Sequence, residues 1–246
     1  MKSGTAEPGG RDDDRRGAVL DAAGAVFLDV GFQAATTAEI ARRARVSKRT
    51  IYELFGSKAG LLDALIRAST DRMTAPLDLP APDGPAAFRA MLTAFGTRLL
   101  EELVDPARIG LYRLAIAEAG PDRAIGRHLD DSGRRPVMDA SGRLFAAAET
   151  AGLVPAGEAG PVPTAFLKKL MGARQLCLLL GTAETAGLVP VGEAGLVQAA
   201  FLNMLMGPLQ LWLLLGTVET PGPDAIAARV AAAIRVVERL CGRTGG

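Results

Sequence analysis

The chain has few of the residues from which most metal and redox sites are built. Its 246 residues include two cysteines, Cys177 and Cys241, and a single histidine, His128. The cysteines lie too far apart to form a zinc-binding or redox motif, and one histidine excludes a multi-histidine metal centre. We therefore expect no metal and no cofactor. In a reducing, intracellular setting both cysteines should pack as small apolar side chains.

The chain also lacks a large excess of charge of either sign. Its 28 basic and 27 acidic residues give a net charge of +1, so the molecule as a whole is not a general polyanion binder. Charge is instead concentrated between Ile40 and Gly60. That window has one acidic residue, Glu53, and six basic ones: Arg42, Arg43, Arg45, Lys48, Arg49 and Lys58. A local basic patch of this kind is the electrostatic signature expected of a DNA-binding surface.

No sustained run of alternating β-branched residues is present, which argues against a sheet-based fold. Apolar residues instead recur at helical spacing, interrupted by proline and glycine. We predict an all-α fold, with a proline-rich linker over 76–85. The polar, glycine-rich residues 1–14 predict a disordered arm and no signal peptide. The expected helices cover 15–30, 37–44, 48–55, 58–70, 86–104, 106–119, 122–130, 135–151, 163–180, 197–215 and 225–240.

Residues 36–58, TTAEIARRARVSKRTIYELFGSK, predict two short helices separated by a three-residue break. Thr36 is a candidate N-cap, and Glu39 three residues later completes a capping box. Ser47 can cap the second helix. Gly56 stands where a helix needs a residue in the left-handed region. These local signals predict a helix-turn-helix.

The start of the second helix carries hydroxyl and cationic side chains over 47–50. A helix N-terminus adds free backbone N–H groups and a partial positive charge. Both features suit phosphates and base edges in a DNA major groove. On the opposite side, Ile51, Leu54 and Phe55 are spaced to face inward.

This stretch, preceded by a helix ending in FLDVGF (27–32) and by Thr36 and Thr37, closely resembles the DNA-binding domain of TetR-type transcriptional regulators. The resemblance covers roughly residues 15–70. It implies a TetR-like fold, with a helix-turn-helix domain over 15–70 after the arm and a helical ligand-sensing and dimerisation domain over 71–246. The expected function is that of a cytoplasmic, non-enzymatic homodimeric repressor. It would bind a palindromic double-stranded DNA operator and be released by a small, apolar effector.

The resemblance also assigns roles to single residues. It puts Lys48 and Arg49 nearest to the bases, although many family members have a small residue where Arg49 stands. An acidic residue often follows the equivalent of Lys58, where this chain has Ala59. Tyr52 could equally be a half-buried core aromatic. The positions that match phosphate-holding ones in the family are Thr37, Ser47, Thr50, Tyr52 and Lys58.

The middle helices are where the resemblance implies an effector pocket. Each candidate could equally be an ordinary core residue, because aromatic and large apolar side chains at helical spacing are what any core needs. We expect the nearby His128 to be a surface or capping residue. The candidate lining residues are Phe95, Leu99, Tyr112, Ile116, Met138 and Phe145.

The sequence of residues 149–183 recurs over 184–218, with 25 of 35 aligned positions identical. Two copies are too few for a solenoid, so an in-frame tandem duplication of one loop and one helix is the simpler explanation. This chain should then carry one helix more than its relatives. The second copy has Asn203, Met204 and Leu209 where the first has Lys168, Lys169 and Arg174, which predicts that its helix over 197–215 is buried. With the final helix, 225–240, it should form the dimer interface.

Two alternatives remain open at this stage. The chain could be a helical small-molecule-binding protein that has lost DNA binding and kept the helix-turn-helix as a scaffold. It could also be membrane-attached, because the uncharged stretch 194–218 is long enough for a membrane span. Gln198, Asn203, Gln210 and the Gly207–Pro208 break argue against a span, so we expect no membrane.

Overall fold

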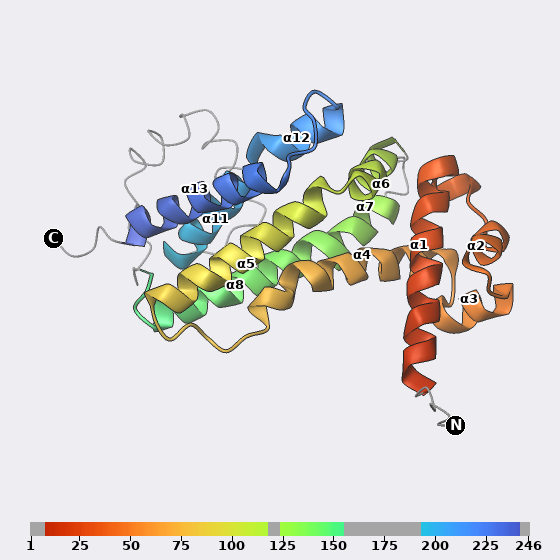
Figure 1. Cartoon of the computed structure of the whole chain (residues 1–246), viewed down its shortest axis with the longest axis horizontal. Coiled ribbons are helices and arrows are strands. Elements are labelled where there is room, and N and C mark those ends of the chain that lie inside the picture. The colour runs from red at the N-terminus through yellow and green to blue at the C-terminus, as the bar shows by residue number, and fades with distance from the viewer. Residues whose placement is uncertain (1–7, 118–123, 155–192, 242–246) are drawn as a thin grey trace, which may run out of the picture. The chain divides into compact units, whose positions relative to one another are not determined.

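The computed structural model describes residues 8–117, 124–154 and 193–241. All secondary structure in these ranges is helical, as predicted (Figure 1). The elements are α1 (Pro8–Ala34), α2 (Thr37–Ala44), α3 (Lys48–Phe55), α4 (Lys58–Thr74), η1 (Ala75–Leu77), α5 (Pro85–Val104), α6 (Pro106–Ala117), α7 (Ala124–Leu129), η2 (Asp130–Arg134), α8 (Arg135–Thr150), α11 (Glu193–Leu205), α12 (Gly207–Leu215) and α13 (Pro223–Cys241).

Contacts between residues divide the chain into two compact units. The first unit comprises the described residues of Met1–Arg72, Glu102–Pro136 and Leu213–Thr220. The second comprises those of Met73–Glu101, Val137–Trp212 and Pro221–Gly246. The first unit is therefore larger than the domain we expected over 15–70, because α6, α7 and the end of α12 pack with the N-terminal helices.

The helix-turn-helix is built around α1, whose inner face forms the centre of the first unit's core. Val19, Ala23 and Val26 are fully buried there, together with Phe27. The helix departs from helical geometry at Gly31, where φ is 82° and ψ is 162°, so the end predicted at Gly31 is a kink, and helical structure continues to Ala34. Its start was predicted wrongly. The helix already begins at Pro8, so residues 8–14 are its first turns and not part of a disordered arm.

Local capping groups fix the two short helices as the sequence predicts. The Thr36 side chain accepts the Glu39 backbone N–H at 3.2 Å, and the Ser47 side chain accepts the Thr50 N–H at 3.0 Å. Gly56 has a φ of 73° at the end of α3. The turn between the helices uses Arg45 in the left-handed region, with φ 54° and ψ 40°.

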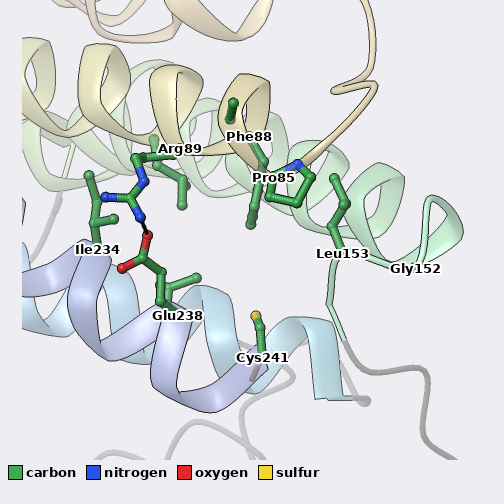
Figure 2. A pocket seen from close by; sticks show the side chains of 11 residues that line it. Pro85, Phe88, Arg89, Gly152, Leu153, Ile234, Glu238 and Cys241 are labelled. Carbon is green, nitrogen blue, oxygen red and sulfur yellow. Dashed lines mark ion pairs between the residues drawn. The ribbon is translucent and has the colours of Figure 1, made fainter. Parts of the chain in front are cut away.

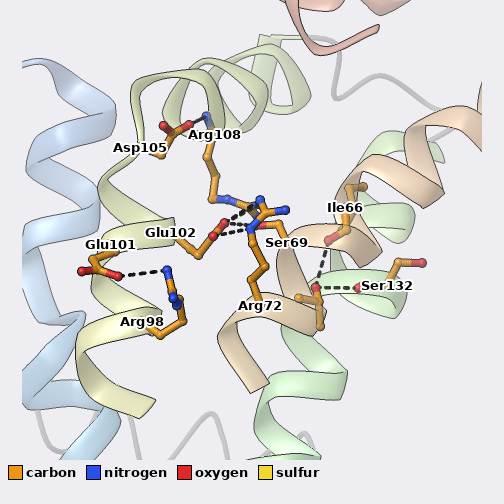
Figure 3. Close-up of polar contacts among 10 residues, drawn as sticks. Ile66, Ser69, Arg72, Arg98, Glu101, Glu102, Asp105, Arg108 and Ser132 are labelled. Carbon is orange, nitrogen blue, oxygen red and sulfur yellow. Dashed lines mark hydrogen bonds and ion pairs between the residues drawn. The ribbon is translucent and has the colours of Figure 1, made fainter. Parts of the chain in front are cut away.

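A polar cluster in the first unit joins α4 to the junction of α5 and α6 (Figure 3). Its centre is the Glu102 carboxylate, whose side chain is 12% exposed. Arg72 donates to it through Nε at 2.5 Å and Nη2 at 3.0 Å, and Ser69 donates through its hydroxyl. Arg108 Nη2 lies 3.5 Å away on a side chain only 9% exposed, and its Nε has no hydrogen-bond partner. One carboxylate thus connects three helices.

The second unit has an aromatic core. Phe145 packs against Phe88 and Phe201 with ring centroids 5.6 and 6.0 Å apart, and Phe95 stacks on Phe201 at 6.3 Å. All four side chains are buried. Gln198 adds a polar contact in this core, since its Nε2 donates to the Met138 carbonyl at 2.9 Å and to Ser141 Oγ at 2.8 Å.

The second sequence repeat is described in part. Phe201, Leu202 and Leu205 are buried, which confirms the predicted core position for α11, whereas Leu211, Trp212 and Leu215 of α12 are exposed. The single helix predicted over 197–215 is wrong, because the chain breaks between α11 and α12. Gly207 has a φ of 33° there, and Pro208 cannot donate a backbone hydrogen bond. The first copy's helix, predicted over 163–180, and the extra helix that it implies lie outside the described residues.

Two helical stretches are long and apolar enough to cross a membrane by length and composition alone, Asp12–Ala34 and Val197–Leu215. Core helices of soluble proteins meet the same criterion. The first stretch buries its apolar face among α2, α3 and α4. The second contains the break at Gly207 and supplies Phe201 and Leu205 to the second unit's core. Packing within each unit therefore accounts for part of their apolar side chains, and others, such as Val30 and Leu211, stay exposed.

Candidate nucleic-acid interface

The start of α3 presents hydroxyls and a cation at the surface, as predicted. Ser47 is exposed and shares a 2.8 Å hydrogen bond with the Thr50 hydroxyl. The Lys48 ammonium lies 5.9 Å from the centroid of the Tyr52 ring, within cation–π range. Tyr52 is 46% exposed, so it isn't a core aromatic. These four side chains form an open, donor-rich helix tip that can approach phosphates or base edges.

Arg49 projects from the same tip but is engaged along its own helix. Its side chain is 87% exposed, and its Nε donates to Glu53 Oε1 at 2.7 Å. The hydrogen bond and charge of Glu53 raise the pKa of Arg49. The spacing of four residues makes this pair readable from the sequence, although we had not predicted it. Glu53 therefore holds Arg49 in one orientation and offsets its charge before any DNA contact.

The basic patch over 40–60 is weaker than its composition suggests. Glu39, just before that window, accepts hydrogen bonds from Arg42 and Arg43, each at 2.8 Å. Arg43 also pairs with Asp29 of α1 at 2.5 Å. The hydrogen bonds from Arg42 and Arg43 lower the pKa of Glu39 to about 2, so it is charged at neutral pH. The positive potential is consequently centred on the start of α3 and not on α2.

Lys58, the first residue of α4, makes hydrogen bonds to backbone carbonyls of the protein itself. Its Nζ donates to the carbonyls of Phe32, Gln33 and Ala35 at 2.7, 3.1 and 3.1 Å. It also lies 4.6 Å from the centroid of the Phe32 ring. An ammonium group has three donors, and all three are engaged here. A phosphate contact would require it to leave a carbonyl, so we omit Lys58 from the proposed DNA-contacting set.

Replacing Lys58 with methionine tests this internal role. The change removes the cation that satisfies the carbonyls after α1, and should lower the free energy of unfolding by about 1–3 kcal/mol. The slope of log affinity for DNA against log salt should stay the same. Lys48→Met, at an exposed position, is the matched control and should leave unfolding almost unchanged. A slope lowered by about one with normal stability would instead assign Lys58 to a phosphate.

Other residues near the tip have roles that differ from the expected ones. Thr37 is buried, which leaves little of it open to a phosphate. Arg16 of α1, which the sequence offered as a possible phosphate or minor-groove contact, donates through Nη1 to the Leu54 carbonyl at 3.4 Å. Its guanidinium also lies 4.8 Å from the centroid of the Phe55 ring. Arg16 thus supports the last turn of α3, through contacts that no local sequence signal indicates.

The residues expected to line an effector pocket fall into both units. Phe95, Leu99 and Phe145 are at most 1% exposed in the second unit, where they form core. Met138 is half-buried there. In the first unit, Tyr112 is half-buried and burial raises the pKa of its phenol, whereas Ile116 is 63% exposed. His128, expected at the surface, is half-buried and bonded to Asp63 at 2.7 Å.

Two stretches of the chain match known families of transcription regulators. Residues 19–65 match the family described as bacterial regulatory proteins of the tetR family. Residues 90–158 match the C-terminal domain of AefR-like transcriptional repressors. The first match contains α2 and α3, including Ser47, Lys48, Arg49, Thr50 and Tyr52.

Individual relatives agree with this. The uncharacterized HTH-type transcriptional regulator YdeS of Bacillus subtilis is 38% identical over 84 residues, or 34% of this chain and 39% of YdeS. The match thus spans about two fifths of this curated relative. A TetR-family regulator from Mesorhizobium loti has a TM-score of 0.63 at 18% identity, covering 94% of this chain and 98% of that one. FadR from Bacillus subtilis, solved with stearoyl-CoA, has a TM-score of 0.56 at 12% identity and covers 91% and 97%.

At such identities the solved structures show the fold alone, and the two family matches indicate transcription regulation. TetR-type proteins are transcription regulators and not enzymes. The capped α2–turn–α3 geometry, observed independently of these comparisons, is a helix-turn-helix with an exposed helix start. Residues 19–65 and 90–158 thus match the N-terminal and C-terminal domains of TetR-family transcription regulators, and the solved relatives show the same fold.

Proposed function

We propose that this chain is a cytoplasmic homodimeric repressor that binds a palindromic DNA operator through α3 and is released by a small, apolar effector. The observation that carries the proposal is the start of α3, where Ser47, Lys48 and Thr50 are exposed or half-exposed on a helix fixed by its own caps. Such a helix start can enter a major groove and read base edges. Lys48 and Arg49 would read bases, and Ser47, Thr50 and Tyr52 would position the helix on phosphates.

The direction of regulation and the effector class rest on the relatives. The C-terminal match is described as a repressor domain, which supports repression. FadR from Bacillus subtilis was solved with stearoyl-CoA, a molecule with a long apolar chain. That complex supports an apolar effector for this chain too, because both proteins share the fold.

A second copy of the chain is proposed to cover α12. This short helix exposes three large apolar side chains, Leu211, Trp212 and Leu215, at 55%, 45% and 65%. Contiguous exposed apolar surface is typical of protein interfaces. A symmetric dimer would also supply the two α3 helices that a palindrome requires.

A mobility-shift titration with the DNA upstream of the chain's own gene tests the proposal. We expect a discrete complex on this DNA, containing two chains per site by mass, and at least a thousandfold weaker binding to a scrambled sequence of equal length. Equal affinity for both sequences would favour a small-molecule-binding protein that has lost DNA recognition. A complex of one chain per site would contradict the dimer.

A further inference from the structure

A pocket of about 480 Å³ lies within the second unit, and none of the residues expected to bind an effector lines it (Figure 2). Its walls come from the first turns of α5, the segment after α8 at Gly152 and Leu153, and the last turns of α13. This volume is within the range of about 300–1,000 Å³ that is usual for small-molecule sites. Three separate elements therefore enclose a space of ligand size.

The inner wall of the pocket is apolar. Phe88, Leu92, Ile234 and Val237 line it and are each at most 6% exposed, so their positions are fixed by the core behind them. Cys241 completes this wall. Burial, followed by the charge of Glu238, raises the pKa of the Cys241 thiol to about 11. The thiol is therefore neutral at pH 7, and the interior favours a hydrocarbon or aromatic body.

Charge is confined to one edge of this pocket. Among the lining residues, Arg89 of α5 and Glu238 of α13 are the charged ones, and they form an ion pair that links the two helices at one side of the pocket (Figure 2). Their side chains are 63% and 40% exposed. Because solvent-exposed ion pairs contribute little to stability, Glu238 can be exchanged for another carboxylate at low cost. The planar guanidinium of Arg89 suits such a carboxylate through two parallel hydrogen bonds.

We propose that this pocket binds an apolar carboxylic acid, with its hydrocarbon against Phe88 and Ile234 and its carboxylate paired with Arg89 in place of Glu238. The inference deepens the proposed function, because it gives the effector a class and a site. The pocket touches α13, so a bound acid would contact one of the helices expected at the dimer interface. Its test contains no DNA, so failure here and failure of operator binding are separate results.

Calorimetric titration with three probes of equal chain length tests the class of ligand. Decanoate, 1-decanol and decylamine share the hydrocarbon and differ in the head group. We expect decanoate to bind most tightly and decylamine most weakly. Tighter binding of decylamine would show that Glu238 and not Arg89 receives the ligand, and would overturn the proposal. Absence of binding by all three would overturn it as well.

The two halves of the ion pair should respond in opposite directions. Arg89→Gln should weaken decanoate binding by about tenfold or more and leave 1-decanol unchanged. Glu238→Gln removes the internal competitor and should strengthen decanoate binding by about two- to fivefold. If the ion pair only held α5 and α13 together, each variant would change the affinities for decanoate and 1-decanol in the same direction. That outcome would contradict the assignment.

Blocking the space provides an independent test. Ala86 is an exposed residue of the pocket lining, so Ala86→Phe should fill the opening without disturbing the core and should abolish binding of decanoate and 1-decanol. Ala90→Phe adds the same ring to an exposed position one turn further along α5, outside the lining, and is the matched control. Equal affinities for the two variants would show that the probes bind elsewhere. Circular dichroism checks that both variants are folded. If Ala86→Phe unfolds, the Arg89 and Glu238 variants still test whether the probes bind in this pocket.

Discussion

Replacing Glu102 with glutamine should lower the free energy of unfolding by about 3 kcal/mol, the largest effect on stability that we expect from one exchange of similar size. The carboxylate accepts from Ser69 and Arg72 and lies 3.5 Å from the buried Arg108 (Figure 3). Removing one partner of a buried ion pair costs about 3–5 kcal/mol, because the other charge is left in the interior. The lower end applies, since Arg72 is 56% exposed and Asp105 lies nearby.

The neighbouring residue supplies the control. Glu101 pairs with Arg98 at 3.3 Å, but both side chains are about half exposed (Figure 3). Glu101→Gln removes the same charge and should cost less than about 1 kcal/mol. Urea unfolding of both variants measures the difference. Equal losses would show that the cluster around Glu102 does not act as a buried pair.

The stability that the Glu102 carboxylate contributes should depend on pH in a defined direction. Burial alone would raise the pKa of Glu102, but the hydrogen bonds from Arg72 and Ser69 outweigh burial and lower it. A lowered pKa in the folded state means that the stabilisation is present above the ordinary glutamate pKa of about 4.3. It is lost as the pH falls through the folded pKa. The difference in free energy of unfolding between the wild-type protein and Glu102→Gln should therefore be largest near pH 7 and should become smaller below about pH 4.

Lys48→Met should reduce affinity for the operator by about 10- to 100-fold, the largest effect on DNA binding expected from one side chain at the helix start. The ammonium lies at the exposed start of α3, where it can reach guanine O6 and N7. Such a contact contributes about 1–3 kcal/mol of discrimination between bases. Binding to unrelated DNA should fall much less. Fluorescence anisotropy with the operator and with a scrambled duplex at one salt concentration measures both quantities.

Arg67→Met is the control for loss of a positive charge. Arg67 is exposed on α4 and lies outside the proposed contacts, so its loss should change both affinities slightly and equally. If Lys48→Met weakened both duplexes by the same factor, Lys48 would be a phosphate contact and not a base contact. Arg49→Ala should relax the base preference as well, to an extent set by how firmly Glu53 holds Arg49.

Signals local in sequence predicted the helix-turn-helix well. Caps at Thr36, Ser47 and Gly56 act within four residues, so the residues that form them are visible in the sequence. The break between α11 and α12 was also visible as Gly207–Pro208, yet the apolar pattern over 197–215 outweighed it in our prediction. Helix boundaries follow backbone chemistry at such a pair more closely than they follow apolar periodicity.

Contacts between distant residues could not be predicted in this way. Lys58 bonds carbonyls more than twenty residues earlier in the chain, and Glu102 bonds side chains on α4 about thirty residues away. The two phenylalanines expected around an effector, Phe95 and Phe145, both pack against Phe201. Their spacing indicates burial without indicating what they are buried against. The pocket beside Arg89 joins α5 to α13, two helices whose pairing the sequence leaves open.

The central claim is that two copies of the α3 start enter the same DNA duplex in one symmetric particle. Footprinting of the full chain on the upstream DNA tests it most directly. Our account predicts two protected half-sites related by a two-fold axis, with centres about 10 base pairs or a multiple of one helical turn apart. At the lowest concentration at which the wild-type protein gives full protection, Lys48→Met should protect neither half-site. A single asymmetric footprint, or full protection by the Lys48 variant at that concentration, would contradict the account.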